Sequence, residues 1–273
     1  MDMPVARTRR PAVAGYFYAE EPAELAAEVD ACLGPRQAIA ARGLITPHDS
    51  YARSGRVAGA AFGRVAIPRR CIVIGPSHTN AGLPWRLMTN GAYRTPLGDV
   101  PVDEALAQAW QARCPWLAPE TATHLGEHAI EVQVPFLQRL GPDDLTLVPL
   151  IVGTEDWDET ARTAHGLAQA VRLAEEPVLI IGTSDLSHYE PDARTRAQDQ
   201  QLLEAIAALD GAEFLRRVRT CQAAVCGNGV IALVLEAVRA LGATRADCVA
   251  YATSAQAGGD PEAAVGYAGV ILQ

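Results

Sequence analysis

The chain has 273 residues, of which 49% are hydrophobic and 20% are charged, so it can bury a substantial core and has an ordinary globular composition. Its 23 basic and 32 acidic side chains give a net charge of −9, which argues against nucleic acid or an anionic membrane surface as the main partner. No apolar run approaches the ~20 residues that span a bilayer, and residues 1–18 lack the apolar centre of a secretory signal. We therefore expect a cytoplasmic protein that binds neither nucleic acid nor membranes.

Segments typical of helices alternate with segments typical of buried strands along most of the chain. In chain order the sequence predicts a helix over residues 23–33, a strand over 43–46, a helix over 55–65, a strand over 71–75, helices over 102–112 and 127–140, a strand over 145–153, a helix over 157–174, a strand over 177–182, helices near 192–208, 211–220 and 229–241, and strands over 248–255 and 263–272. This alternation predicts an α/β fold with a mostly parallel or mixed central sheet and helices on both faces. No repeat, low-complexity tract or linker divides the sequence, so we expect a single domain over residues 1–273.

The sequence has six cysteines, and no two of them form a CxxC pair. In a reducing compartment we expect no disulfide bonds between them. Four lie in apolar segments and are predicted to be small core residues: Cys32, Cys71, Cys221 and Cys248. Cys226 differs, because it precedes Gly227-Asn228-Gly229 at the start of a predicted helix. The helix dipole and the free backbone N–H groups at that position favour a thiolate.

Three of the six histidines follow the ends of predicted strands. His48 lies in ITPHDSY, His78 in IGPSHTN and His188 in IGTSDLSHY. The carboxyl ends of parallel strands meet at one edge of a sheet, where ligands bind in open α/β folds, so we expect these loops to converge on one pocket. Asp185, close to His188, is suited either to fix the tautomer of that imidazole and raise its basicity or to cap a turn.

Two imidazoles from these loops together with the Cys226 thiolate form a donor set for a borderline or soft metal ion. Fe(II), Cu and Zn accept such donors, whereas Mg and Ca prefer oxygen ligands. The sequence therefore predicts a transition-metal site at the carboxyl edge of the sheet.

A second polar cluster, in GEHAIEVQVPF, contains Glu127, His128 and Glu131. On a regular helix Glu127 and Glu131 share a face and His128 points elsewhere, so the three cannot all bind one ion. If Glu127 and His128 stood in or before the first turn of the helix, they would still line a pocket. The alternative is that they form a helix start that is exposed to solvent. His124 lies in a nearby polar loop without an evident partner, and His165 is expected on the polar face of a helix without a role.

Ser77 in GPSHT and Ser184 in GTSDL approximate the G-x-S-x-G motif of serine hydrolases. Both motifs lack the final glycine, which is replaced by Thr79 and Leu186. A hydrolase with one of these serines as its nucleophile is therefore the weakest of the hypotheses about function.

Taken together, the ordered motifs resemble those of the Memo family, known in prokaryotes as protein B of the AmmeMemoRadiSam system. In order they are ITPHDSYARSG, IVIGPSHTN, YRTPLGDV, GEHAIEVQVPFL, IIGTSDLSHY, CGNGVI, and YATSAQAGGD followed by VGYAGV. The resemblance extends from RPAVAGYFY at residues 10–18 to the last predicted strand, so it covers nearly the whole chain.

This resemblance implies a fold similar to that of the class III extradiol dioxygenases, which are non-haem iron enzymes. It implies a pocket in which His48, His78 and Cys226 hold the metal: Fe(II) or Cu, with Zn as a further option. Asp185 and His188 would be catalytic residues of that pocket, with His188 as the acid/base. A small molecule or a peptide would be the ligand, and AMMECR-type and radical-SAM proteins of the same system would be functional partners.

Two features depart from the family pattern. Asp49 and Ser50 replace the small pair of the usual P-H-A-G-Y motif, and the Asp49 carboxylate either alters the metal preference or faces solvent. Cys226 stands where the dioxygenases have a glutamate ligand, and a thiolate is softer and can be oxidised. The leading hypothesis is a metal-dependent oxidoreductase; the alternative is a non-catalytic binding or adaptor protein that uses the same pocket.

Overall fold

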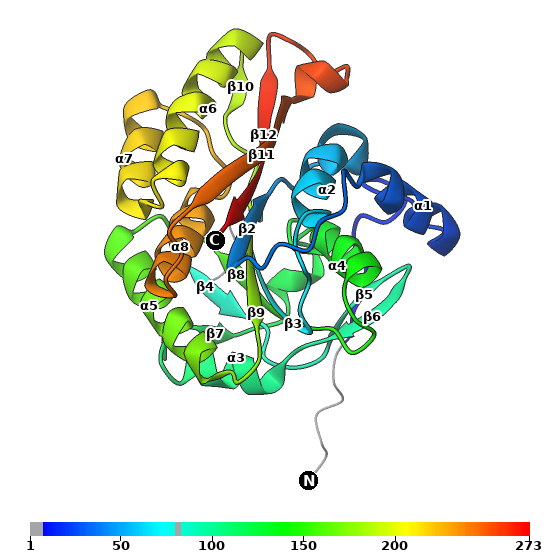
Figure 1. The fold of residues 1–273 in the computed structure, drawn as a ribbon, viewed down its shortest axis with the longest axis vertical. Coiled ribbons are helices and arrows are strands. Elements are labelled where there is room, and N and C mark those ends of the chain that lie inside the picture. The colour runs from blue at the N-terminus through cyan, green and yellow to red at the C-terminus, as the bar shows by residue number, and fades with distance from the viewer. Residues whose placement is uncertain (1–7, 80–82) are drawn as a thin grey trace.

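The computed structural model describes residues 8–79 and 83–273. Within these ranges a nine-stranded sheet forms the centre of the molecule (Figure 1), with the strand order β10-β12-β2-β9-β3-β8-β4-β7 and with β11 paired to β12. The strands are β2 (Gly43–Thr46), β3 (Arg70–Pro76), β4 (Trp85–Leu87), β7 (Ala118–Pro119), β8 (Thr146–Val152), β9 (Val178–Thr183), β10 (His188–Glu190), β11 (Ala246–Thr253) and β12 (Ala264–Leu272). The central strands β2, β9, β3 and β8 are parallel to one another. By contrast, β12 runs antiparallel to β2, and β4 runs antiparallel to β8 but parallel to β7. The predicted α/β fold with a mostly parallel or mixed sheet is confirmed.

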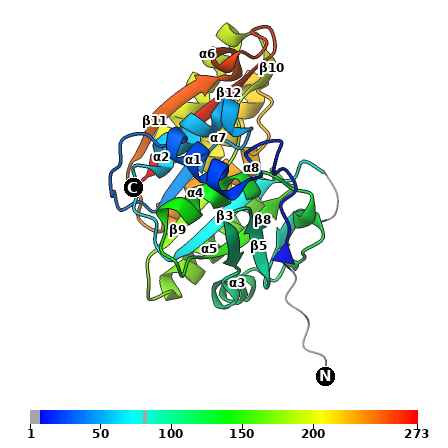
Figure 2. The ribbon, with the colours of Figure 1, turned by 90° about the vertical axis from the view of Figure 1, so that its right-hand side faces the viewer.

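Helices cover both faces of this sheet. On one face lie α3 (Glu104–Gln111), α5 (Trp157–Leu173) and α8 (Asn228–Ala240), with α6 (Asp192–Ala207) and α7 (Gly211–Cys221) packed beside them. On the other lie α1 (Pro22–Cys32), α2 (Arg56–Phe62) and α4 (Val134–Leu140). Figures 1 and 2 show the two groups on opposite sides of the strands. A small separate sheet of β1 (Thr8–Arg9), β5 (Ala92–Thr95) and β6 (Gly98–Pro101) lies near the N-terminal end of the described chain.

The apolar runs of the central strands are explained by burial on both faces. In β3, Ile72 and Ile74 face the core formed with α5 and α8, whereas Cys71 and Val73 face the core formed with α1, α2 and α4. The strand pairs with β9 on one side and with β8 on the other. Because β3 is paired at both edges and packed on both faces, the loop that follows it begins at a rigid point. His78 lies in that loop.

The predicted helix over residues 127–140 is wrong in its first half. Residues Glu131–Gln133 form a 3-10 turn, and α4 begins only at Val134. Pro135 explains the late start, because proline has no backbone N–H and is favoured in the first turn of a helix. The Glu127 carboxylate also accepts the backbone N–H of Ala129, which fixes a tight turn before the helix.

The cysteines are all free, and their burial follows the prediction only in part. Cys32 and Cys71 are buried core residues, as expected. Cys221 is half-buried at the end of α7 and packs against the core, so its assignment holds in part. Cys248 is exposed, so its core assignment is wrong. Cys248 lies on β11, which pairs on one side only, and an apolar pattern in the sequence does not distinguish an edge strand from a central one.

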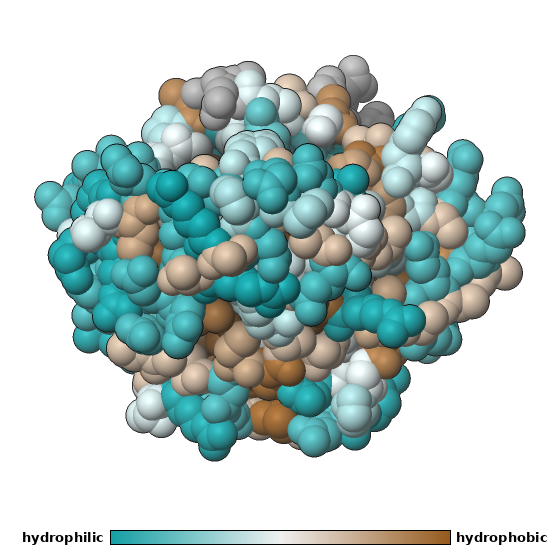
Figure 3. All heavy atoms as spheres, turned by 90° about the horizontal axis from the view of Figure 1, so that it is seen from above, coloured by the Kyte–Doolittle hydropathy of each residue, from teal (hydrophilic) through white to brown (hydrophobic). Residues whose placement is uncertain are grey.

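None of the helices in the described ranges is long and apolar enough to cross a bilayer. Seen from above the view of Figure 1, the surface is mostly polar, with apolar residues gathered toward the lower centre (Figure 3).

His124 is fully buried and hydrogen-bonded, which corrects the expectation of a polar loop residue without a partner. Its Nδ1 lies 2.7 Å from the Tyr93 hydroxyl and its Nε2 lies 3.2 Å from the Arg86 carbonyl oxygen. Burial lowers the pKa of His124 to about 4, so the folded protein holds this imidazole neutral at pH 5.

On account of His124, the free energy of unfolding should fall by about 2 kcal/mol between pH 7 and pH 5. The unfolded chain binds a proton at this histidine below a pKa of about 6.5, whereas the folded chain binds it only near pH 4. Stability is therefore lost as the pH falls through this window. Urea unfolding of the wild type and of His124→Gln at both pH values measures the effect. The variant should lose about 2 kcal/mol less than the wild type; an identical loss would contradict a buried neutral His124.

Candidate metal centre

The candidate site lies where parallel strands of the sheet end. His48 follows β2, His78 follows β3 and Asp185 follows β9, and these three strands are neighbours in the sheet. This is the edge at which open α/β folds bind ligands. The convergence of the loops was expected from the positions of these residues after apolar runs.

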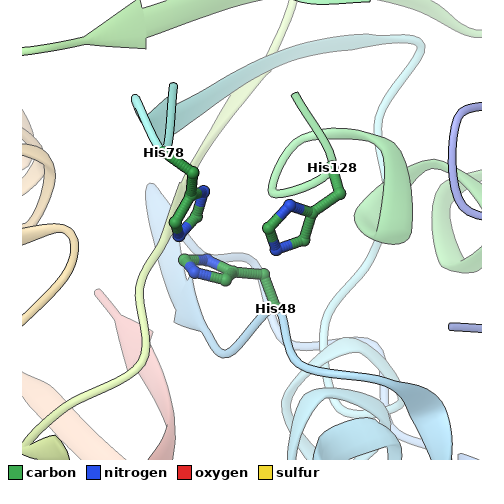
Figure 4. A group of neighbouring side chains, drawn as sticks. All are labelled: His48, His78 and His128. Atoms are coloured by element: carbon green, nitrogen blue, oxygen red, sulfur yellow. The ribbon is translucent and has the colours of Figure 1, made fainter. Parts of the chain in front are cut away.

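Three imidazoles meet at this edge. His48, His78 and His128 offer ligand nitrogens that all lie within 4.8 Å of one another. The ring centroids are 5.0 Å apart for His48 and His78, 5.6 Å for His48 and His128, and 4.5 Å for His78 and His128. Figure 4 shows the rings pointing toward one another from three separate segments. On a regular helix His128 would point away from Glu127 and Glu131; it joins the cluster because residues 127–128 lie before the helix, which is the arrangement in which the sequence allowed them to line a pocket.

His48 is held from behind by neighbouring strands. Its Nδ1 lies 3.0 Å from the Thr183 hydroxyl, and its backbone N–H donates to Asp185 Oδ1 at 2.9 Å. The Gln133 amide donates to the same Thr183 hydroxyl and to the Pro47 carbonyl oxygen. With Nδ1 engaged in this way, Nε2 is the nitrogen that faces the cluster.

His78 is held by the buried Glu127 carboxylate. Glu127 Oε1 lies 2.8 Å from His78 Nδ1, and Oε2 accepts the His78 backbone N–H, also at 2.8 Å. His128 Nδ1 lies 3.5 Å from the same carboxylate, which is a longer contact than the one to His78. Burial works to raise the pKa of Glu127, but the hydrogen bonds and charge of His78 outweigh it and hold that pKa at about 2. A carboxylate behind a histidine is the usual support of a metal-binding imidazole.

A second group of donors adjoins the imidazoles. Cys226 Sγ lies 3.2 Å from His48 Nε2, and it accepts the Asp185 backbone N–H at 3.3 Å. His48, Asp185 and Cys226 offer ligand atoms within 4.8 Å of one another. His48 therefore belongs to both groups, while His78 and Cys226, the other two predicted ligands, belong to one group each.

The CGNG motif lets the Cys226 loop approach the sheet closely. A Cβ at Gly227 would lie 2.6 Å from the Ser184 Cβ, and a Cβ at Gly229 would lie 2.0 Å from the Thr154 carbonyl oxygen. Only glycine fits at such distances. In return the Gly227 backbone N–H donates to the Ser184 hydroxyl at 3.0 Å, which ties the loop to the end of β9.

Burial favours the neutral forms of His48, Cys226 and Asp185. Burial and the neighbouring His78 and His128 lower the pKa of His48 well below its usual value. Burial, with the nearby Asp185 carboxyl, raises the pKa of the Cys226 thiol, which reverses the expectation that the helix start favours a thiolate. Burial also raises the pKa of Asp185 to about 7.

His188 lies close to this site but not in the orientation expected. Its Nδ1 lies 2.8 Å from the Leu186 carbonyl oxygen and 2.9 Å from the Ala224 carbonyl oxygen. The described residues show no hydrogen bond between His188 and Asp185, whose carboxylate instead accepts the His48 backbone N–H. The expectation that Asp185 orients His188 is therefore replaced: two backbone carbonyls orient His188, and Asp185 supports His48.

Two further polar side chains considered in the sequence, Asp49 and His165, have hydrogen-bond partners in the structure. Asp49 accepts hydrogen bonds from the Ser50 backbone N–H and, at 2.6 Å, from the Tyr267 hydroxyl. His165 is exposed on α5, where its Nε2 lies 2.9 Å from Gln169 Nε2. Sequence reasoning missed Gln133 and Thr183, because neither type of residue signals a ligand support outside its tertiary context.

Among the described residues, neither of the two serines considered as nucleophiles has a hydrogen bond to a histidine or carboxylate base. The Ser184 hydroxyl donates to the Asp185 carbonyl oxygen at 2.7 Å. The Ser77 hydroxyl is buried and makes no hydrogen bond within the described ranges. A serine nucleophile needs a hydrogen-bonded general base, so this geometry does not favour a serine hydrolase.

The comparisons with known proteins agree over nearly the full length of the chain. Residues 9–271 match the family model described as Memo-like protein. A MEMO1 family protein of Methanopyrus kandleri is 33% identical over 279 residues, covering 97% of this chain and 99% of that protein. A MEMO1 family protein of Methanothermobacter thermautotrophicus is 36% identical over 273 residues, covering 95% of this chain and 98% of that protein.

Among solved structures, the chain is similar in fold to an uncharacterized protein, JW3007, from Escherichia coli K12. The TM-score is 0.55 at 14% sequence identity, and the match covers 85% of this chain and 99% of that one. At this identity the likeness concerns the fold alone.

Proposed function

The chain belongs to the Memo family, and from this premise we propose that it is a metal-binding protein whose centre supports redox chemistry on a small molecule. The proposed metal is Fe(II) or Cu, with Zn as a further option. The proposed ligands are His48, His78 and Cys226, with His128 as an additional donor. The observation that supports this most directly is the convergence of three imidazoles, two of which, His48 and His78, have their other ring nitrogen held by a hydrogen bond.

The chemistry of the donors fits such a metal. Neutral imidazoles bind through a free lone pair, and the lowered pKa values of His48 and His128 keep these rings neutral near pH 7. Burial and then the charge of His78 lower the pKa of His128. Nitrogen and sulfur donors favour Fe(II), Cu and Zn over Mg and Ca. The Cys226 thiol, whose pKa is raised in the metal-free protein, would lose its proton on binding a metal.

When bound, the metal supplies electron transfer and an open position for a small molecule. The residues of the chain supply orientation and proton handling. Glu127 fixes His78 and lies 3.5 Å from His128, and Asp185 fixes the backbone of His48. His188, whose Nδ1 is engaged by two carbonyl oxygens, would hold or move a proton at Nε2.

Anaerobic reconstitution tests the proposal. The wild type should take up about one Fe(II), Cu or Co(II) ion per chain, measured by elemental analysis after desalting. With Co(II), thiolate ligation should give a charge-transfer band in the near ultraviolet, and this band should disappear in Cys226→Ser. Failure of all of these metals to bind the folded wild type would overturn the proposal.

The alternative is a binding or adaptor protein that uses the same pocket for a peptide or a partner protein. Oxygen uptake by the loaded protein with a panel of catechols and thiols separates the two. Uptake that requires both metal and substrate supports an oxidoreductase. A loaded protein that consumes no oxygen with any of them favours the binding protein. Functional association with AMMECR-type and radical-SAM proteins stays part of the proposal.

A further inference from the structure

A cavity of about 560 Å³ is lined in part by residues of the segment 51–57, which follows His48 in the chain, and its lining includes none of the proposed metal ligands. It opens between α1, the π-helical turn Tyr51–Gly55 with the start of α2, and the turn Ser254–Ala257 that follows β11. Figure 1 shows α1 and α2 side by side next to the β11–β12 pair. Part of its wall is apolar and is formed by Ala31, Cys32, Val57 and Ala252.

Two arginines from the π-helical turn and the helix start line this cavity. Arg56 is exposed, and its side chain makes no hydrogen bond or ion pair with any part of the chain that the structure describes. Arg53 has one weak partner, since its Nη1 lies 3.5 Å from Asp49 Oδ2. In a chain with a net charge of −9, two guanidinium groups that form no close ion pair are unusual at one cavity, and their N–H groups remain available as donors.

The other polar groups of the cavity compensate this charge only in part, because one carboxylate, that of Glu28, stands against two guanidinium groups in the lining. Glu28 also lines it, but its carboxylate accepts the Ala19 backbone N–H at 2.8 Å and forms no ion pair with Arg53 or Arg56 among the described residues. Gln256 accepts the Thr253 backbone N–H through Oε1, which leaves its amide N–H groups available as donors. Guanidinium and amide donors around an apolar wall suit a carboxylate or a phosphate carried on an apolar body.

We propose that this cavity binds a small organic anion through Arg53, Arg56 and Gln256, and that the anion competes with Asp49 for Arg53. The Asp49 carboxylate stands next to His48 in the chain and also accepts the Tyr267 hydroxyl. An anion that draws Arg53 away would change the charge beside the imidazole cluster. The binding itself does not depend on a metal, so this proposal can fail or hold independently of the proposed function.

Calorimetric titration of the metal-free full chain tests the proposal with three probes: benzoate, inorganic phosphate and the uncharged benzyl alcohol. At least one anion should bind, and benzyl alcohol should not. Benzoate alone would identify a carboxylate on an apolar body, and phosphate alone a phosphate group; either result supports an anion site. Arg56→Gln should weaken binding about five-fold, whereas Arg219→Gln, an exposed arginine on α7, should leave it unchanged.

Asp49→Asn tests for the opposite effect, an increase in the affinity for the anion. Removal of the carboxylate that competes for Arg53 should tighten binding of the anion about two-fold. Glu175→Gln, an exposed acid between α5 and β9 with the same change in charge, is the matched control and should have no effect. Any of three results would overturn the proposal: the anions and benzyl alcohol bind with equal affinity, Arg56→Gln and Arg219→Gln have equal effects, or neither anion binds.

Discussion

Replacing His48 by alanine should reduce the bound metal from about one ion per chain to background. His48 is the residue shared by the two groups of donors, so its loss removes a ligand from both. Loss of a residue that only supports a ligand already costs 10–100-fold in affinity, so we expect the affinity of His48→Ala to fall by more than about 100-fold. Equilibrium dialysis with Co(II) or anaerobic Fe(II) measures the change.

The matched control is His165→Ala, which removes an exposed histidine from the middle of α5. It should bind metal as the wild type does. His128→Ala should keep part of the affinity, because His128 belongs to one donor group only. If His48→Ala kept the stoichiometry and affinity of the wild type, the imidazole cluster would not be the metal site.

The central strands could be predicted because a buried strand is the only secondary structure that explains the residue pattern of each. The apolar runs of β2, β3 and β9 are too short for helices and end at proline, glycine or polar residues, so burial in a parallel sheet is their simplest reading. The position of His48 and His78 after such strands then follows from the geometry of the sheet. The short strands β4, β7 and β10 have no pattern long enough to be seen, and they owe their conformation to pairing with a neighbour.

The role of His128 could not be predicted, because it depends on contacts between distant segments. Its segment was expected to be helical on pattern alone. In the structure the Glu127 carboxylate binds both the backbone and the ring of His78, which is 49 residues away in the sequence. Packing of the Phe17 ring at 4.8 Å from the His128 ring comes from a still more distant segment. One sequence without related sequences carries no signal for either contact.

Replacing Glu131 by glutamine should lower the free energy of unfolding by about 3–5 kcal/mol. Glu131 and Arg9 form an ion pair in which both side chains are fully buried. The glutamate also accepts the backbone N–H groups of Ala12 and Val13, at 2.9 and 3.1 Å. Glutamine removes the charge and presents an amide N–H where an acceptor is needed, which leaves the Arg9 guanidinium buried without its counter-ion. Urea unfolding measures the loss.

An exposed ion pair serves as the control. Arg139 and Asp30 are 2.6 Å apart, and their side chains are 39% and 49% exposed. Asp30→Asn should lower the free energy of unfolding by less than about 1 kcal/mol, because solvent screens the pair. If Glu131→Gln cost no more than Asp30→Asn, the buried pair would contribute little to stability.

The same substitution should also weaken metal binding, because the ion pair fixes the segment that carries His128. Arg9 donates from Nε to the His124 carbonyl oxygen at 2.8 Å and from Nη2 to the Glu127 carbonyl oxygen at 2.7 Å. The second of these carbonyls belongs to the peptide bond that leads into His128. An arginine without its counter-ion holds the Glu127 carbonyl oxygen less firmly. We therefore expect Glu131→Gln to weaken Co(II) binding about 10-fold, as loss of a residue that supports a ligand does. A protein already lacking the His128 ring should show a much smaller effect, so the substitution in a His128→Ala background distinguishes orientation of this histidine from general destabilisation.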